Sequence, residues 1–138
     1  MPPTFKELTD YFIAVGANEV SHTNKTYLAH AIGVYGDLNK WGADEDLCRV
    51  GLFHSIYGTE LFQGFTLPLE KRGEVRDMIG VSAERLAYIN CAMQRDSFDA
   101  IISQEQEPYV IKDRLTGGVI EMDKEEFDRL CTLHLCDW

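Results

Sequence analysis

The sequence predicts a mostly α-helical fold with one small β-hairpin before the last helix. Apolar residues recur at steps of three and four through most of the chain, which is typical of helices with one buried face. The alternating strand pattern is confined to residues 109–122, around a Gly-Gly turn. At 138 residues the chain has the length of one domain, so we expect a single domain over residues 1–138.

Three helices are expected before residue 55. The first spans residues 4–15, where Thr4 and Glu7 have the spacing of a capping box. The second spans residues 26–41 and is entered through Ser21-His22-Thr23-Asn24, a segment rich in capping residues. Asp44 caps the third helix, which ends near His54.

The second half of the chain predicts shorter helices and then the hairpin. Residues 57–68 contain two glycines and a proline and are expected to form a loop. Helical patterns follow at residues 69–79, 82–93 and 96–103. Residues 109–112 and 119–122 form the predicted hairpin, and a capping-box pattern at Asp123 and Glu126 starts a last helix that runs to Trp138.

Composition limits the classes of partner. With 23 acidic and 13 basic residues the net charge is −10, which argues against nucleic acid or an anionic membrane as the main partner. Neither a long apolar run nor a secretory signal is present, so we expect a cytoplasmic protein with no membrane span. The four cysteines are scattered and are expected to be buried thiols: Cys48, Cys91, Cys131 and Cys136.

Two histidines on neighbouring helices indicate a metal site. His30 and His54 lie on helices joined by a short connection, and Asp137 lies in an apolar context where an unpaired carboxylate would be costly. Two imidazoles and one carboxylate can hold a divalent metal ion (Zn, Mn or Fe) with an open coordination position. His22 or His134 is a candidate further ligand.

The residues after His54 are candidates for chemistry on a metal-bound water. Glu60 is the candidate general base. Ser55 is a candidate nucleophile, although no Gly-x-Ser-x-Gly elbow surrounds it, and the alternative is a hydrogen bond near the helix end.

A small-molecule ligand is the expected partner of this site. Tyr57 and Thr59 either line the mouth of the pocket or make the turn. Arg72 and Arg76, beside Lys71, either recognise a phosphate or carboxylate or form a solvated helix face.

The spacing of these residues resembles a known family. His30, then Leu52-Phe53-His54, then Leu135-Cys136-Asp137 resemble the motif of the HD-domain metal-dependent phosphohydrolases, especially the alarmone-hydrolase branch, over roughly residues 19–138. Residues 21–30 and 51–60 also resemble a small uncharacterised family of HD-like proteins. The resemblance implies an HD-domain-like helical bundle and a metal bound by His30, His54 and Asp137.

The sequence departs from that family where its motif reads His-Asp, because Ser55 follows His54. Gly58-Thr59 also stands where the alarmone hydrolases carry an acidic pair. We therefore weigh a metal-dependent hydrolase of a small, phosphorylated molecule against a catalytically degenerate HD-like module that binds a small ligand or a partner protein. An iron-dependent oxygenase and a structural or oligomerising domain are further alternatives. Since Asp137 lies in a last helical turn, which tends to fray, we expect the metal or a homodimer contact to hold it.

Overall fold

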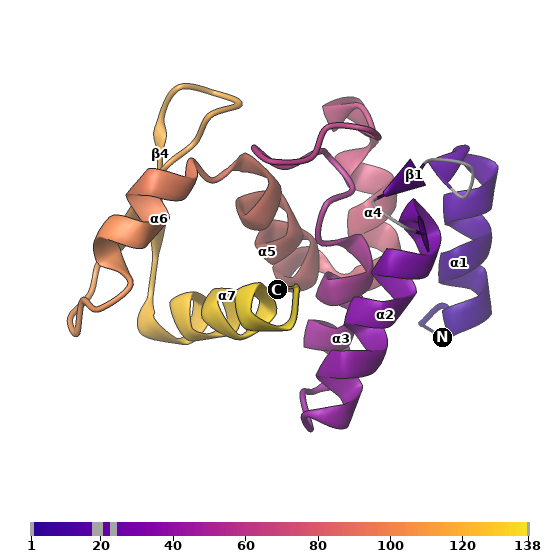
Figure 1. Cartoon of the computed structure of the whole chain (residues 1–138), viewed down its shortest axis with the longest axis horizontal. Coiled ribbons are helices and arrows are strands. Elements are labelled where there is room, and N and C mark those ends of the chain that lie inside the picture. Colours follow the sequence, from indigo (N-terminus) through magenta and orange to yellow (C-terminus); the bar gives the residue numbers. More distant parts are fainter. Residues whose placement is uncertain (1, 18–20, 23–24, 138) are drawn as a thin grey trace.

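The computed structural model of the chain describes residues 2–17, 21–22 and 25–137. The predicted fold class is confirmed, because the structure is mostly helical and a two-stranded hairpin precedes the last helix (Figure 1). The elements, in chain order, are α1 (Phe5–Ala14), β1 (Ser21–His22), β2 (Lys25–Thr26), α2 (Tyr27–Lys40), α3 (Glu45–Phe53), the 3-10 turn η2 (Leu69–Lys71), α4 (Arg72–Ile79), α5 (Val81–Ala92), α6 (Arg95–Ile101), β3 (Tyr109–Lys112), β4 (Val119–Met122) and α7 (Lys124–Asp137).

Side-chain caps set the starts of the helices that carry the site. Thr26 caps α2 by accepting the Ala29 N–H, and Asp44 caps α3 by accepting the Leu47 N–H. The predicted entry to α2 is different in the structure, because Ser21–His22 pairs with Lys25–Thr26 as two short antiparallel strands. Strands of two residues are too short to leave a periodic pattern in the sequence.

Helices α2 and α3 form a closely packed hairpin. Gly51 of α3 permits this approach, since a Cβ atom at its position would lie 2.5 Å from Leu38 Cδ1 and 3.1 Å from Val34 Cγ1 of α2. Helix α5 packs against α3 and is buried around most of its circumference. Helices α2 and α3 pack against each other through their buried faces and run in opposite directions. Residue 30 near the start of α2 and residue 54 just after α3 therefore lie at the same end of the hairpin.

The β3–β4 hairpin determines where α7 begins. Tyr109 pairs with Met122 and Lys112 with Val119, and the Tyr109 ring stacks on Phe127 of α7 at a centroid distance of 4.2 Å. From there α7 runs to the middle of the molecule, and its last turn lies beside α2 and α3 (Figure 1). Among the described residues, no helix is long and apolar enough to cross a membrane.

Candidate metal centre

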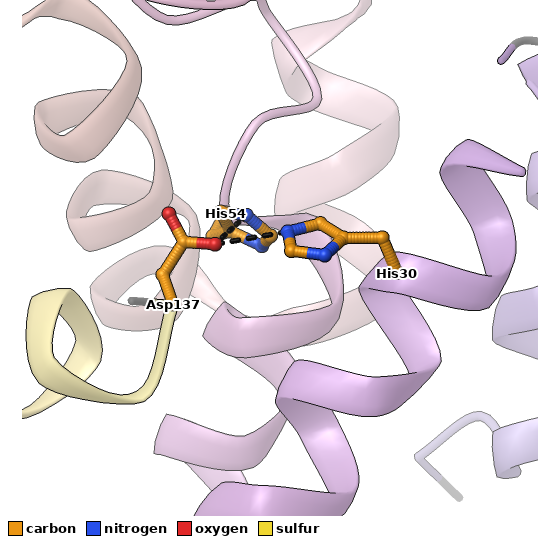
Figure 2. A group of neighbouring side chains, drawn as sticks. All are labelled: His30, His54 and Asp137. Carbon is orange, nitrogen blue, oxygen red and sulfur yellow. Dashed lines mark hydrogen bonds and ion pairs between the residues drawn. The ribbon is translucent and has the colours of Figure 1, made fainter. Parts of the chain in front are cut away.

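Three side chains from distant parts of the sequence meet at one carboxylate oxygen. His30 comes from α2, His54 directly follows α3, and Asp137 is the last residue of α7 (Figure 2). Asp137 Oδ1 lies 2.9 Å from His30 Nε2 and 3.0 Å from His54 Nε2. One ligand atom from each of the three residues lies within 4.8 Å of the other two. The structure therefore brings together the three residues that the sequence proposed as metal ligands.

The backbone of His54 is fixed by α5. Asn90 Nδ2 donates to the His54 carbonyl at 2.6 Å, and the Cys91 thiol donates to the same oxygen at 3.3 Å. Asn90 and Cys91 are both buried, as the thiol prediction requires for Cys91. This carbonyl lies past the end of α3 and would otherwise lack a helical partner. The hydrogen bonds from α5 satisfy it and hold the His54 ring in place.

The protonation of His54 follows from its second ring contact. His54 Nδ1 lies 2.7 Å from the Gly51 carbonyl oxygen, which can only accept, so Nδ1 carries a proton. In a neutral imidazole Nε2 then presents a lone pair, and here that lone pair would face the lone pairs of Asp137 Oδ1. Two arrangements resolve this conflict: a second proton on His54, or a cation between Nε2 and Oδ1.

Asp137 is ionised in this environment. Burial opposes the charged carboxylate, but when His30 and His54 donate to it their hydrogen bonds outweigh burial and hold the pKa of Asp137 well below its usual range. The His54 side chain is 3% exposed, while those of His30 and Asp137 are 17% and 23% exposed. The cluster is thus anchored on the buried side by His54 and reached by solvent on the side of the other two.

Two of the three separations between ligand atoms are close to those of a first-row metal site. In a tetrahedral site with bonds of about 2.0–2.1 Å, neighbouring ligand atoms are separated by about 3.3 Å. The two histidine-to-carboxylate distances, 2.9 and 3.0 Å, are a few tenths of an ångström shorter. Side-chain rotation alone can supply that difference. The carbonyl of Gly51 on the far nitrogen of His54 is also the usual outer partner of a metal-ligating histidine.

Ser55 is buried and bonded rather than presented to solvent. Its hydroxyl donates to the Tyr27 hydroxyl at 3.0 Å, and both side chains are buried. This is the hydrogen bond near the helix end that the sequence offered as the alternative to a nucleophile.

Glu60 and Thr59 have local structural partners. The exposed Glu60 carboxylate accepts the backbone N–H of Arg95 at 3.0 Å, at the start of α6. The Thr59 hydroxyl accepts the Phe62 N–H at 3.0 Å and makes the turn, which was one of its two predicted roles. The predicted role of Glu60 as a base remains a prediction.

Tyr57, Arg72 and Arg76 converge on a carboxylate that the sequence analysis missed. Glu84 is 1% exposed and accepts hydrogen bonds from Arg72 at 2.7 and 2.9 Å, from Tyr57 at 2.7 Å and from Arg76 at 3.4 Å. Burial opposes the charged form, but the bonds from Arg72 and Tyr57 keep the pKa of Glu84 below its usual value. The available signal was an acidic residue within the largely apolar helix at residues 82–93.

The other two candidate histidines lie outside the cluster or outside the described side chains. His134 Nδ1 lies 3.3 Å from Arg95 Nη1, and burial together with the Arg95 charge lowers the pKa of His134. Among the described residues, the group with metal-ligand spacing does not include His134. His22 belongs to β1, and its side chain lies outside the described part of the structure, as does Trp138 at the predicted end of the last helix.

Comparison with known protein families gives a match over most of the chain. The family model of a domain of unknown function, DUF6817, matches residues 11–95, which is well over half of the chain. The matched region includes His30 and His54 and ends before Asp137. Neither the curated proteins nor the solved structures contain a match. The chain therefore belongs to the DUF6817 family.

Proposed function

We propose that this protein binds one divalent metal ion through His30, His54 and Asp137 and is a metal-dependent hydrolase of a small, phosphorylated molecule. The contact between His54 Nε2 and Asp137 Oδ1 carries this proposal. The Gly51 carbonyl fixes the proton on the other ring nitrogen, so in the neutral ring Nε2 is a lone-pair donor aimed at the carboxylate of Asp137. A cation between His54 Nε2 and Asp137 Oδ1 would bind to both atoms.

The environment of the cluster supports a metal over a second proton on His54. A protonated His54 would place a full charge on a side chain that is 3% exposed, and the carboxylate that faces it among the described residues is shared with His30. A metal ion accepts lone pairs from all three residues at once. Nitrogen and carboxylate ligands in this ratio suit Zn²⁺, Mn²⁺ and Fe²⁺.

Among the described residues the centre has three protein ligands, and that number favours a catalytic over a structural metal. Structural zinc sites are closed by four protein ligands, whereas catalytic sites use three and keep a position for water or substrate. A metal bound in this way would supply Lewis acidity and an acidified water. His30 and Asp137 are partly exposed, so solvent reaches this side of the centre. The resemblance of the three positions to the HD-domain phosphohydrolases supports a phosphorylated substrate.

The surroundings of the cluster also favour a second candidate, a degenerate module that binds a small ligand without turnover. Ser55 replaces the carboxylate of the family motif and is bonded to Tyr27. Glu60, the candidate base, is bonded to the backbone of Arg95. Arg72 and Arg76, the candidate anion-binding residues, are paired with Glu84. The ligand-binding roles of Arg72, Arg76 and Tyr57 remain predictions.

Elemental analysis of protein purified without added metal tests the metal site. We expect about one Zn, Mn or Fe per wild-type chain, and a loss of that metal in His54→Ala and Asp137→Asn. Asp128→Asn is the matched control, because Asp128 lies on the same helix but is exposed and pairs with Lys124. Metal-free wild-type protein that also fails to take up added Zn²⁺, or Asp137→Asn with full metal, would refute the site.

A hydrolysis assay then separates the two candidates. Metal-loaded wild type and His54→Ala are incubated with a panel of phosphomonoesters, phosphodiesters and nucleotides, and inorganic phosphate or the released alcohol is measured. The hydrolase proposal expects turnover that disappears with His54. A protein that binds its metal and hydrolyses none of the panel would support the degenerate module instead.

A further inference from the structure

Two buried hydroxyls adjoin the histidines of the candidate metal centre. Tyr27 precedes His30 by three residues on α2, so the two side chains share a helix face, and Ser55 directly follows His54. Tyr27 is 1% exposed and Ser55 is 4% exposed. Their oxygens are 3.0 Å apart, which links the two elements that supply the histidines.

The hydrogen bonds of this pair leave one proton unused. Two hydroxyls carry two protons, and the bond between Ser55 and Tyr27 consumes one of them. Among the described residues, the structure gives neither hydroxyl another acceptor. We assign the free proton to Tyr27, with Ser55 as the donor of the bond between them. A buried donor without an acceptor is costly and is rare in folded proteins.

The Tyr27 hydroxyl is held in one direction and stays protonated. Its ring packs against Phe12, Phe62 and Phe65, with centroid distances of 6.2, 5.8 and 5.5 Å. Burial raises the pKa of Tyr27, and the negative charge of nearby Asp137 acts in the same direction. The phenol is therefore a neutral donor at all ordinary pH values, one helical turn before His30 and hydrogen-bonded to the residue that follows His54.

We propose that the Tyr27 hydroxyl donates its free proton to an oxyanion that binds at the His30–His54–Asp137 centre, with Ser55 orienting it. This inference rests on the proposed function, because the oxyanion needs the metal to offset the charge of Asp137. An oxygen ligand supplies the missing acceptor, whereas a ligand with an apolar group at that position would leave the buried donor unsatisfied. Tyr27 is thus a specificity-determining residue for oxyanions such as phosphate.

The test measures phosphate binding to the Co²⁺-loaded protein. The visible absorption of Co²⁺ reports both the ligand set of the metal and the arrival of inorganic phosphate. We expect Tyr27→Phe to keep the Co²⁺ spectrum of the phosphate-free protein and to bind phosphate about tenfold more weakly, the effect of one lost hydrogen bond to a charged group. Ser55→Ala should weaken phosphate about threefold, because the donor remains but loses its orientation. Tyr35→Phe is the control, since Tyr35 lies on the same helix and bonds to Glu45.

The outcomes separate this inference from the metal site. If wild type takes up no Co²⁺, the proposed function and the inference both fail. If Co²⁺ binds but phosphate affinity is equal in wild type and Tyr27→Phe, the inference alone is overturned. A larger loss in Ser55→Ala than in Tyr27→Phe would overturn the assignment of Tyr27 as the donor. If Tyr27→Phe does not fold, Ser55→Ala is the test. A threefold loss of phosphate affinity then supports the inference, and wild-type phosphate affinity overturns it.

Discussion

Gly51→Ala should destabilise the protein, although the same change usually strengthens a helix. Replacing a helical glycine by alanine favours the folded state by about 1 kcal/mol. At Gly51, however, the new Cβ would lie 2.5 Å from Leu38 Cδ1, about 1 Å inside an ordinary carbon–carbon contact. Leu38 is fully buried and Val34 Cγ1 is 3.1 Å from the same point, so the end of the Leu38 side chain would have to rotate within the packed core.

The two effects can be compared in magnitude. Overpacking a buried contact costs about 1–3 kcal/mol, and an overlap of about 1 Å belongs in the upper part of that range, about 2–3 kcal/mol, which exceeds the gain in helix propensity. We expect a net loss of about 1–2 kcal/mol and a fall in Tm of about 4–8 °C for a domain of this size. Gly51 also accepts the proton of His54 Nδ1, and α2 carries His30, so forcing α2 from α3 should weaken metal binding as well.

Thermal unfolding measured by circular dichroism checks this prediction, with Gly33→Ala as the control. Gly33 lies on α2, and a Cβ at its position would meet nothing within 4 Å, so that variant should gain about 1 kcal/mol. The reasoning requires the two variants to shift in opposite directions. An unchanged or higher Tm in Gly51→Ala would show that the α2–α3 contact is not as close as described.

Two further predictions concern the buried carboxylates. Because the pKa of Glu84 is lower in the folded than in the unfolded protein, its stabilisation is present above about pH 4.5 and is lost as the pH falls below that value. In urea unfolding at pH 7, Glu84→Gln should be about 3 kcal/mol less stable than wild type, because Arg72 loses its buried partner. Below pH 4.5 the variant should lose less stability than wild type does. The same fall in stability with pH in both proteins would contradict this. EDTA should lower the Tm of metal-loaded wild type and leave the Tm of Asp137→Asn unchanged. The loss in free energy of unfolding of wild type is up to about 2.7 kcal/mol if the metal was present at 100 times its Kd. An equal response of the two proteins to EDTA would argue against Asp137 as a ligand.

Helix starts and the hairpin could be predicted because they depend on local chemistry. Thr4 and Glu7 form the reciprocal capping box expected from their spacing, and Asp44 caps α3. The hairpin strands begin and end at the predicted residues. The β1–β2 pair was missed, because two residues per strand carry no pattern and only the pairing itself defines them.

The roles of the charged residues near the site could not be predicted from spacing. Arg72 and Arg76 form a basic cluster in the sequence, and the carboxylate that pairs with them, Glu84, lies one helix further on. Whether an arginine faces solvent, a ligand or a buried acid depends on how α4 packs on α5. The same limit applies to Glu60, whose partner is a backbone amide 35 residues away.

By itself, the sequence determined the class of the fold and the ends of most helices. It also identified the three candidate metal ligands, His30, His54 and Asp137. Those conclusions follow from periodicity, capping residues and the cost of an unpaired carboxylate, all of which are local. Only the tertiary structure decided that one oxygen of Asp137 meets both histidines, and that the Gly51 carbonyl turns His54 into a lone-pair donor. Contacts across 107 residues depend on where the β3–β4 hairpin places α7 against the α2–α3 pair, and no local pattern encodes that placement.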